Sequence, residues 1–133
     1  MAYLTESPAT EQALQEIRLR LRDGLHVATT LGYGPRFLHS TGQFHKGGSN
    51  IGLFLQLTTD DAVDTQVPGQ PYSFSTFKRA QALGDLEALR RHSRRVIQIH
   101  LTDDVSRGLV ALEQAVAASL EEAAAVALVE TLA

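Results

Sequence analysis

Apolar residues recur at three- and four-residue steps in the N-terminal part of the chain, at Leu14, Ile17 and Leu21. This spacing places them on one face of a helix. Ser7 is a suitable cap, Pro8 fits the first helical position, and Gly24 is a suitable stop. The pattern therefore predicts a helix over residues 8–23.

Two further stretches show the helical period. Ser73 precedes an apolar stripe made of Phe74, Phe77, Ala80, Leu83, Leu86 and Leu89. The pair Gly84-Asp85 is expected to kink this helix or to split it in two. The last stretch runs from about residue 104 to the end, with Thr102 or Asp103 as its expected cap and an apolar face at Leu109, Leu112, Val116 and Leu120.

Three short apolar runs instead have the character of strands: residues 25–31, 51–58 and 95–101. The first two are nearly continuous in apolar character, which predicts strands covered on both faces. The links between the three runs are 19 and 36 residues long, long enough for parallel crossovers. The alternation of strands and helices predicts a small α/β layer structure with a mostly parallel sheet. Such a small sheet has exposed edges, which suggests additional short strands or a partner that completes it.

The loop at residues 32–50 concentrates the candidate chemistry. It holds five of the ten glycines and two of the five histidines, and it follows a predicted strand, where α/β folds bind ligands. Arg36 and Lys46 offer positive charge for a phosphate, and His39 and His45 titrate near neutral pH. Hydroxyl and amide groups are supplied by Ser40, Thr41 and Gln43, and close backbone approach by Gly47 and Gly48. Two interpretations stay open on this chemistry alone: a sugar-phosphate site, or a structural glycine loop whose polar groups satisfy one another.

Composition narrows the classes of function. The net charge of −3 gives no general attraction to nucleic acid, and the basic cluster at residues 90–95 suits the C-terminus of a helix better than a nucleic-acid partner. No apolar run is long enough to span a membrane, and no signal peptide begins the chain. The absence of cysteine excludes disulfides and thiolate metal sites and favours the cytoplasm. The loop has no carboxylate to complete a metal site, and Asp60-Asp61 suits a solvated turn, so we expect neither a metal nor a cofactor.

Several segments together carry a family resemblance. The run at residues 33–48 contains His-Ser-Thr-Gly-Gln-Phe-His-Lys-Gly-Gly, and residues 52–56, 68–74 and 80–86 extend the likeness. Over about residues 3–118 the chain resembles the C-terminal region of bifunctional transaldolase/glucose-6-phosphate isomerase proteins. The resemblance implies a single sugar isomerase (SIS)-type domain over residues 1–133, with a three-layer αβα fold. It also implies a link to the interconversion of glucose 6-phosphate and fructose 6-phosphate.

The resemblance suggests roles for the loop residues. His45, Lys46 and His39 are the candidate catalytic residues. The candidate substrate-binding residues are Arg36, Ser40, Thr41, Gln43, Gly47 and Gly48. Other parts of the family's site lie mostly upstream of this region: its glutamate base, its ring-opening histidine and its main phosphate-binding serine/threonine loop. The stretch 108–114 has no match to the family's catalytic lysine.

Enzymatic activity would therefore need residues from outside this chain. The expected partners are a sugar phosphate and either a second copy or an upstream isomerase or transaldolase portion. The alternative function is a non-catalytic phosphosugar-binding or assembly module.

Overall fold

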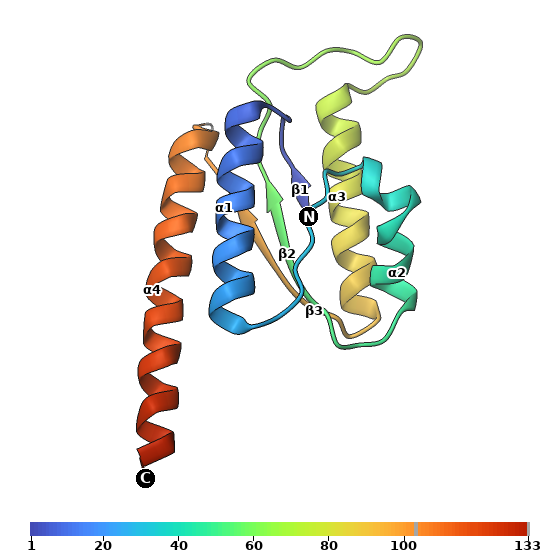
Figure 1. The fold of residues 1–133 in the computed structure, drawn as a ribbon. Helices are drawn as coiled ribbons and strands as arrows, with labels where there is room; N and C mark the ends of the chain where they lie inside the picture. Colours follow the sequence, from blue (N-terminus) through green and yellow to red (C-terminus); the bar gives the residue numbers. More distant parts are fainter. Residues whose placement is uncertain (103, 133) are drawn as a thin grey trace. The chain divides into compact units, whose positions relative to one another are not determined.

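The computed structural model describes residues 1–102 and 104–132, and the side chains of residues 128–132 are outside this description (Figure 1). Within the described residues, the fold is α/β, with a three-stranded parallel sheet and four α-helices. The chain divides into two units, which we describe separately. The first comprises Met1–Thr5 and Gly32–Asp103, and the second Glu6–Leu31 and Asp104–Ala133.

The sheet lies in the first unit and has the strand order β1-β2-β3. Strand β2 (Leu53–Thr58) pairs in parallel with β3 (Arg95–His100) along its whole length, so that Thr58 lies opposite His100. Strand β1 (Ala2–Tyr3) pairs with the carboxyl end of β2 on its other side. The predictions of a parallel sheet and of these two longer strands are confirmed. Of the two suggestions for the exposed edges, an additional short strand or a partner, strand β1 matches the first.

Helix α3 (Phe74–Arg91) packs on the sheet through a hydrogen-bonded chain of side chains. Gln98 Nε2 donates to Gln56 Oε1 at 2.7 Å, and Gln56 Nε2 donates to the carbonyl oxygen of Ala82 at 3.1 Å. Ser73 caps this helix as predicted, by accepting a hydrogen bond from the amide of Thr76. The predicted break at Gly84-Asp85 is wrong, because the helix runs without interruption and buries the Asp85 side chain.

Because α3 is continuous, Gly84 only weakens it. A Cβ atom at this position would meet nothing within 4 Å. We therefore expect Gly84→Ala to raise the free energy of unfolding by roughly 0.5–1 kcal/mol, since alanine loses less backbone entropy in a helix. Urea denaturation checks this expectation, and a lower stability of the variant would contradict the continuous helix.

The glycine-rich segment at residues 32–50 begins beside β1 and then forms two short helices. The amide of Ala2 donates to the carbonyl of Gly32, and that of Gly34 to the carbonyl of Ala2. The 3-10 helix η1 (Arg36–His39) and helix α2 (Thr41–Gly47) follow. The guanidinium of Arg94 donates to the carbonyl oxygens of Lys46 and Gly48, so part of the basic cluster caps a helix end.

The second unit consists of two helices side by side (Figure 1). Helix α1 (Pro8–Leu25) begins at the predicted Ser7 cap, and helix α4 (Val105–Leu132) pairs with it through an ion pair of 3.0 Å between Arg20 and Glu113. The amide of Arg107 donates to the Asp104 carboxylate, so the cap is not at Thr102, and Asp103 lies outside the described residues.

The predicted strand at residues 25–31 is wrong. Leu25 is the last residue of α1, and His26 ends the helix in the left-handed conformation, with φ 53° and its amide bonded to the carbonyl of Arg22. The following residues form no regular structure, and Leu25 and Val27 are exposed. The apolar, β-branched composition of this run predicts a strand buried on both faces. The folded chain does not cover the run in this way, so the prediction fails.

Candidate functional site

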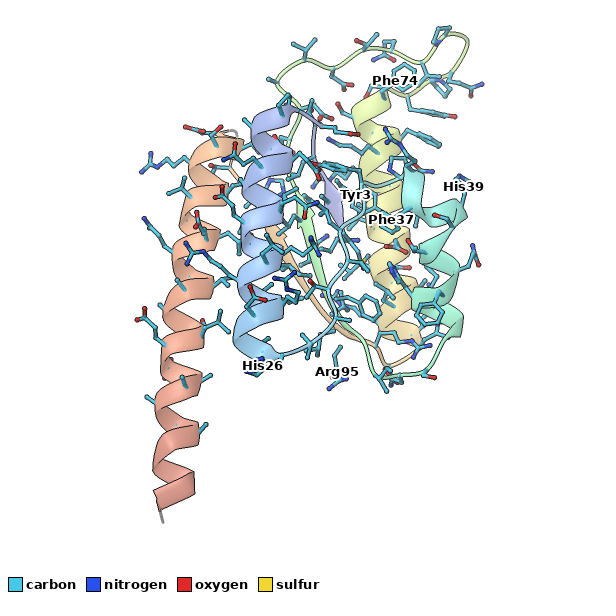
Figure 2. The ribbon with its side chains drawn as sticks, in the orientation of Figure 1. Tyr3, His26, Phe37, His39, Phe74 and Arg95 are labelled. Carbon is cyan, nitrogen blue, oxygen red and sulfur yellow. The ribbon has the colours of Figure 1, made fainter. Side chains whose placement is uncertain are left out.

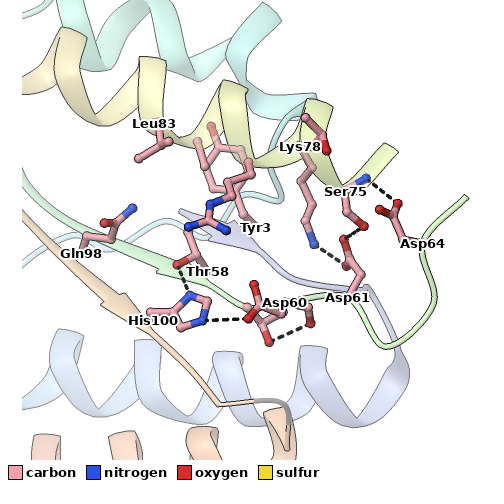
Figure 3. Close-up of a pocket in the computed structure, with 14 residues that line it drawn as sticks. Tyr3, Thr58, Asp60, Asp61, Asp64, Ser75, Lys78, Leu83, Gln98 and His100 are labelled. Atoms are coloured by element: carbon pink, nitrogen blue, oxygen red, sulfur yellow. Dashed lines mark hydrogen bonds and ion pairs between the residues drawn. The ribbon is translucent and has the colours of Figure 1, made fainter. Parts of the chain in front are cut away.

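A cavity of about 470 Å³ lies where β2 and β3 end, beside the first turns of α3 (Figure 3). Open α/β sheets bind ligands in this position, outside the carboxyl ends of their parallel strands. All of its lining residues belong to the first unit. They are Tyr3, Thr58, Thr59, Asp60, Asp61, Asp64, Ser75, Thr76, Lys78, Arg79, Ala82, Leu83, Gln98 and His100.

One wall of the cavity joins α3 to the segment that precedes it. Asp61 pairs with the ammonium of Lys78 and accepts a hydrogen bond of 2.7 Å from the hydroxyl of Ser75 (Figure 3). Asp64 accepts a hydrogen bond of 3.0 Å from the amide of Ser75. Hydrogen bonds from the Ser73 hydroxyl and from Ser75 lower the pKa of Asp64. Asp61 and Asp64 thus both accept hydrogen bonds from Ser75 at the first turn of α3.

The opposite wall is formed by the ends of the strands. The ring of His100 lies 3.1 Å from the Thr58 hydroxyl through Nδ1, and 3.6 Å from the Asp60 carboxylate through Nε2. Arg79 also lines the cavity, and within the described part of the chain its guanidinium has no hydrogen-bond or ion-pair partner. This guanidinium is thus available to an anion.

These groups suit a ligand that carries hydroxyl groups and an anionic group. Carboxylates, hydroxyls and imidazole exchange hydrogen bonds with a polyol, and a guanidinium binds phosphate through two parallel hydrogen bonds. The described residues include no group of three or more histidine or acidic side chains placed to hold a metal ion. Nor is any described helix of the length and apolar character that a membrane span requires.

None of the site residues predicted from the loop lines this cavity. His39 lies at the end of η1, on the outer side of the fold (Figure 2). The other predicted residues with exposed positions are Arg36, Ser40, Thr41, Gln43 and Gly47, and Gly48 is half-buried. The predicted residues therefore lie outside this cavity.

The structure places two of the residues predicted from the loop, Lys46 and His45, against α3. The ammonium of Lys46 lies 2.7 Å from the Asp85 carboxylate, and their side chains are 22 % and 1 % exposed. Burial, followed by the neighbouring charge of Asp85, raises the pKa of Tyr3. Asp85 is the carboxylate that the loop itself lacks. Its position between Ala82 and Leu89 on the buried face is the signal in the sequence, although the pair Gly84-Asp85 by itself predicts a helix break.

The ring of His45 lies between two aromatic rings, 5.9 Å from that of Phe37 and 5.1 Å from that of Phe54, centre to centre. Burial lowers the pKa of His45, and the charge of Asp85 opposes this effect only in part. The imidazole therefore favours its neutral form in the folded protein.

The lowered pKa of His45 predicts a dependence of stability on pH. As the pH falls through the ordinary value of 6.5, the unfolded chain takes up this proton first, so the folded state loses stability. We expect the free energy of unfolding to fall less between about pH 7.5 and about pH 5 in His45→Gln than in the wild type. Urea denaturation at the two pH values checks this, and equal slopes would contradict it.

Comparison of the chain with protein-family models, with curated proteins and with solved structures finds no match.

Proposed function

We propose that this chain is a sugar-phosphate-binding α/β domain related to the C-terminal region of glucose-6-phosphate isomerase. The proposal includes a three-layer SIS-type fold and a cytoplasmic location. The resemblance in residues 33–48 supports the choice of substrate, and the cavity at the carboxyl end of the sheet supports the binding.

The observation that carries the proposal is the composition of the cavity. Thr58, Thr59, Ser75 and Thr76 bring hydroxyl groups from β2, the segment that follows it and α3, and Arg79 brings a cation without a partner in the described chain. A sugar phosphate presents matching groups, with hydroxyls along its carbon chain and a phosphate at one end. Both a hydroxyl-rich wall and an available cation are therefore present in one cavity.

Isomerisation requires more than binding. An aldose–ketose isomerase must move a proton between neighbouring carbon atoms, which needs a base near the substrate. His45 and Lys46 lie outside the cavity, and Lys46 is already paired with Asp85. We propose that the chain by itself binds the sugar phosphate, and that catalysis needs residues from an upstream isomerase portion.

Calorimetric titration with fructose 6-phosphate and with 6-phosphogluconate tests the proposal. We expect saturable binding to the wild type and at least about tenfold weaker binding to Arg79→Ala. Arg91→Ala is a matched control, because Arg91 is an exposed cation in the last turn of the same helix. Failure of the wild type to bind either compound, or an equal loss in both variants, would overturn the proposal.

A non-catalytic assembly module is a second candidate, favoured by helix α4. Leu120 of α4 packs at Gly24, near the end of α1, and residues 121–127 beyond this contact are all exposed. A second copy would cover this part of the helix. Sedimentation equilibrium tests the candidate, and a strict monomer would remove it.

A further inference from the structure

The corner of the cavity that Lys78 and Ser75 form already holds a carboxylate of the protein, that of Asp61. One carboxylate oxygen of Asp61 pairs with the ammonium of Lys78, and the other accepts the hydrogen bond of the Ser75 hydroxyl. An ammonium and a hydroxyl that converge on one carboxylate form the kind of environment that also holds a phosphate oxygen. Asp61 thus lies where an anionic ligand group would be held.

Asp61 belongs to the segment that joins β2 to α3, residues 59–73. Most residues of this segment are exposed, among them Val63 and Asp64. Its main internal connections lie at its far end, where the amide of Val67 donates to the carbonyl of Tyr72 and Gln66 pairs with Ser73. Beside Asp61, the Thr59 hydroxyl donates to the carbonyl of Thr102, and Asp60 lies 3.6 Å from the ring of His100. Asp61 itself contacts Ser75 and Lys78 through its carboxylate, so this carboxylate is able to move away while α3 stays in place.

A phosphate has two advantages over Asp61 in this corner. It carries close to two negative charges and three terminal oxygens, whereas a carboxylate carries one charge and two oxygens. Lys78 and Arg79 are neighbours on α3, and both line the cavity. A phosphate that lay between these two side chains would contact both cations, whereas Asp61 pairs with Lys78 alone.

We propose that the ligand's phosphate binds to Lys78, Ser75 and Arg79 and displaces the Asp61 carboxylate from that position. This inference rests on the proposed function and fixes the orientation of the ligand. The phosphate lies against α3, and the sugar hydroxyls lie toward Thr58 and His100 at the strand ends. Asp61 closes the empty site and competes with the ligand.

Inorganic phosphate is the simplest probe, because it carries no sugar hydroxyls. We expect Asp61→Asn to bind inorganic phosphate and fructose 6-phosphate at least about tenfold more tightly than the wild type. The matched control is Asp60→Asn, which removes the same charge from a residue of the same cavity that does not contact Lys78. This control is expected to change the affinity for phosphate by less than about threefold. Asp61→Ser provides a second variant should the asparagine side chain keep the contact with Lys78.

The outcomes separate the two proposals. Absence of binding by the wild type and by both Asp61 variants would overturn the proposed function and this inference together. Binding by the wild type, with equal affinities in the Asp61 and Asp60 variants, would overturn only the displacement of Asp61. Hydrogen exchange gives an independent test: amides of residues 60–66 in the wild type should exchange faster when fructose 6-phosphate is bound, and slower exchange would contradict displacement.

Discussion

Replacing Lys46 with methionine is expected to lower the free energy of unfolding by about 3 kcal/mol, because it leaves a carboxylate buried without its cation. The Asp85 side chain is only 1 % exposed, and Lys46 lies 2.7 Å from it. Urea denaturation of the wild type and the variant measures the loss. If the ion pair is the cause, the double variant Lys46→Met/Asp85→Leu should recover most of the lost stability.

The pair between Arg91 and Glu87 is the matched control for Lys46. It lies on the same helix as Asp85, but its side chains are 76 % and 64 % exposed. Water and salt screen such a pair, so Arg91→Ala should cost less than about 0.5 kcal/mol. A Lys46→Met variant that loses no more stability than Arg91→Ala would show that the buried pair does not hold the loop against α3.

Replacing Gly34 with alanine is expected to cost about 2–3 kcal/mol by overpacking the core of the first unit. A Cβ atom at this position would lie 2.4 to 2.7 Å from three ring carbons of Tyr3. Tyr3 is fully buried and packs edge-on against Phe37, with ring centres 5.6 Å apart, so its ring cannot move aside. Thermal and urea denaturation both measure this effect.

Gly47→Ala is the control for Gly34, because a Cβ atom there meets nothing within 4 Å. Its expected effect is below about 0.5 kcal/mol in either direction, since Gly47 is the last, exposed residue of α2. Equal stabilities of the two alanine variants would contradict the close approach of Gly34 to Tyr3.

The sequence predicted those parts of the fold that depend on local patterns. Periodicity and the caps at Ser7 and Ser73 located α1 and α3, and the continuous apolar runs located β2 and β3. Strand β1 has two residues, too few to show a period, and only its pairing with β2 defines it. At residues 25–31 the local composition favoured a strand, but the left-handed turn at His26 directs the chain otherwise.

The cavity is harder to predict from the sequence, because its residues come from separate segments, none of which carries a recognisable binding motif by itself. The sequence places Asp60 and Asp61 in a solvated turn, and His100 lies within the predicted strand at residues 95–101. The register that places Thr58 opposite His100 brings these segments to the same end of the sheet. Residues 25–31 form no strand, so the rule that ligands bind at the carboxyl ends of parallel strands does not place a site in the loop that follows them.

The structure explains the positions of two polar residues in the loop at residues 32–50, His45 and Lys46. Its inner side holds His45 between aromatic rings and Lys46 on Asp85, which agrees with the structural alternative for these two residues. The assignment of catalytic and substrate-binding roles to the loop stays a prediction. A partner chain that approaches the exposed side of η1 and α2 would meet His39 and Thr41 there.

The position of the bound sugar phosphate is the most direct test of the proposed function. Amide chemical shifts of the ¹⁵N-labelled chain, recorded during a titration with fructose 6-phosphate, measure it residue by residue. The proposal predicts that saturable shifts concentrate at residues 58–61, 75–79 and 98–100, around the cavity. Shifts confined to residues 36–48, or no saturable shift at all, would contradict it.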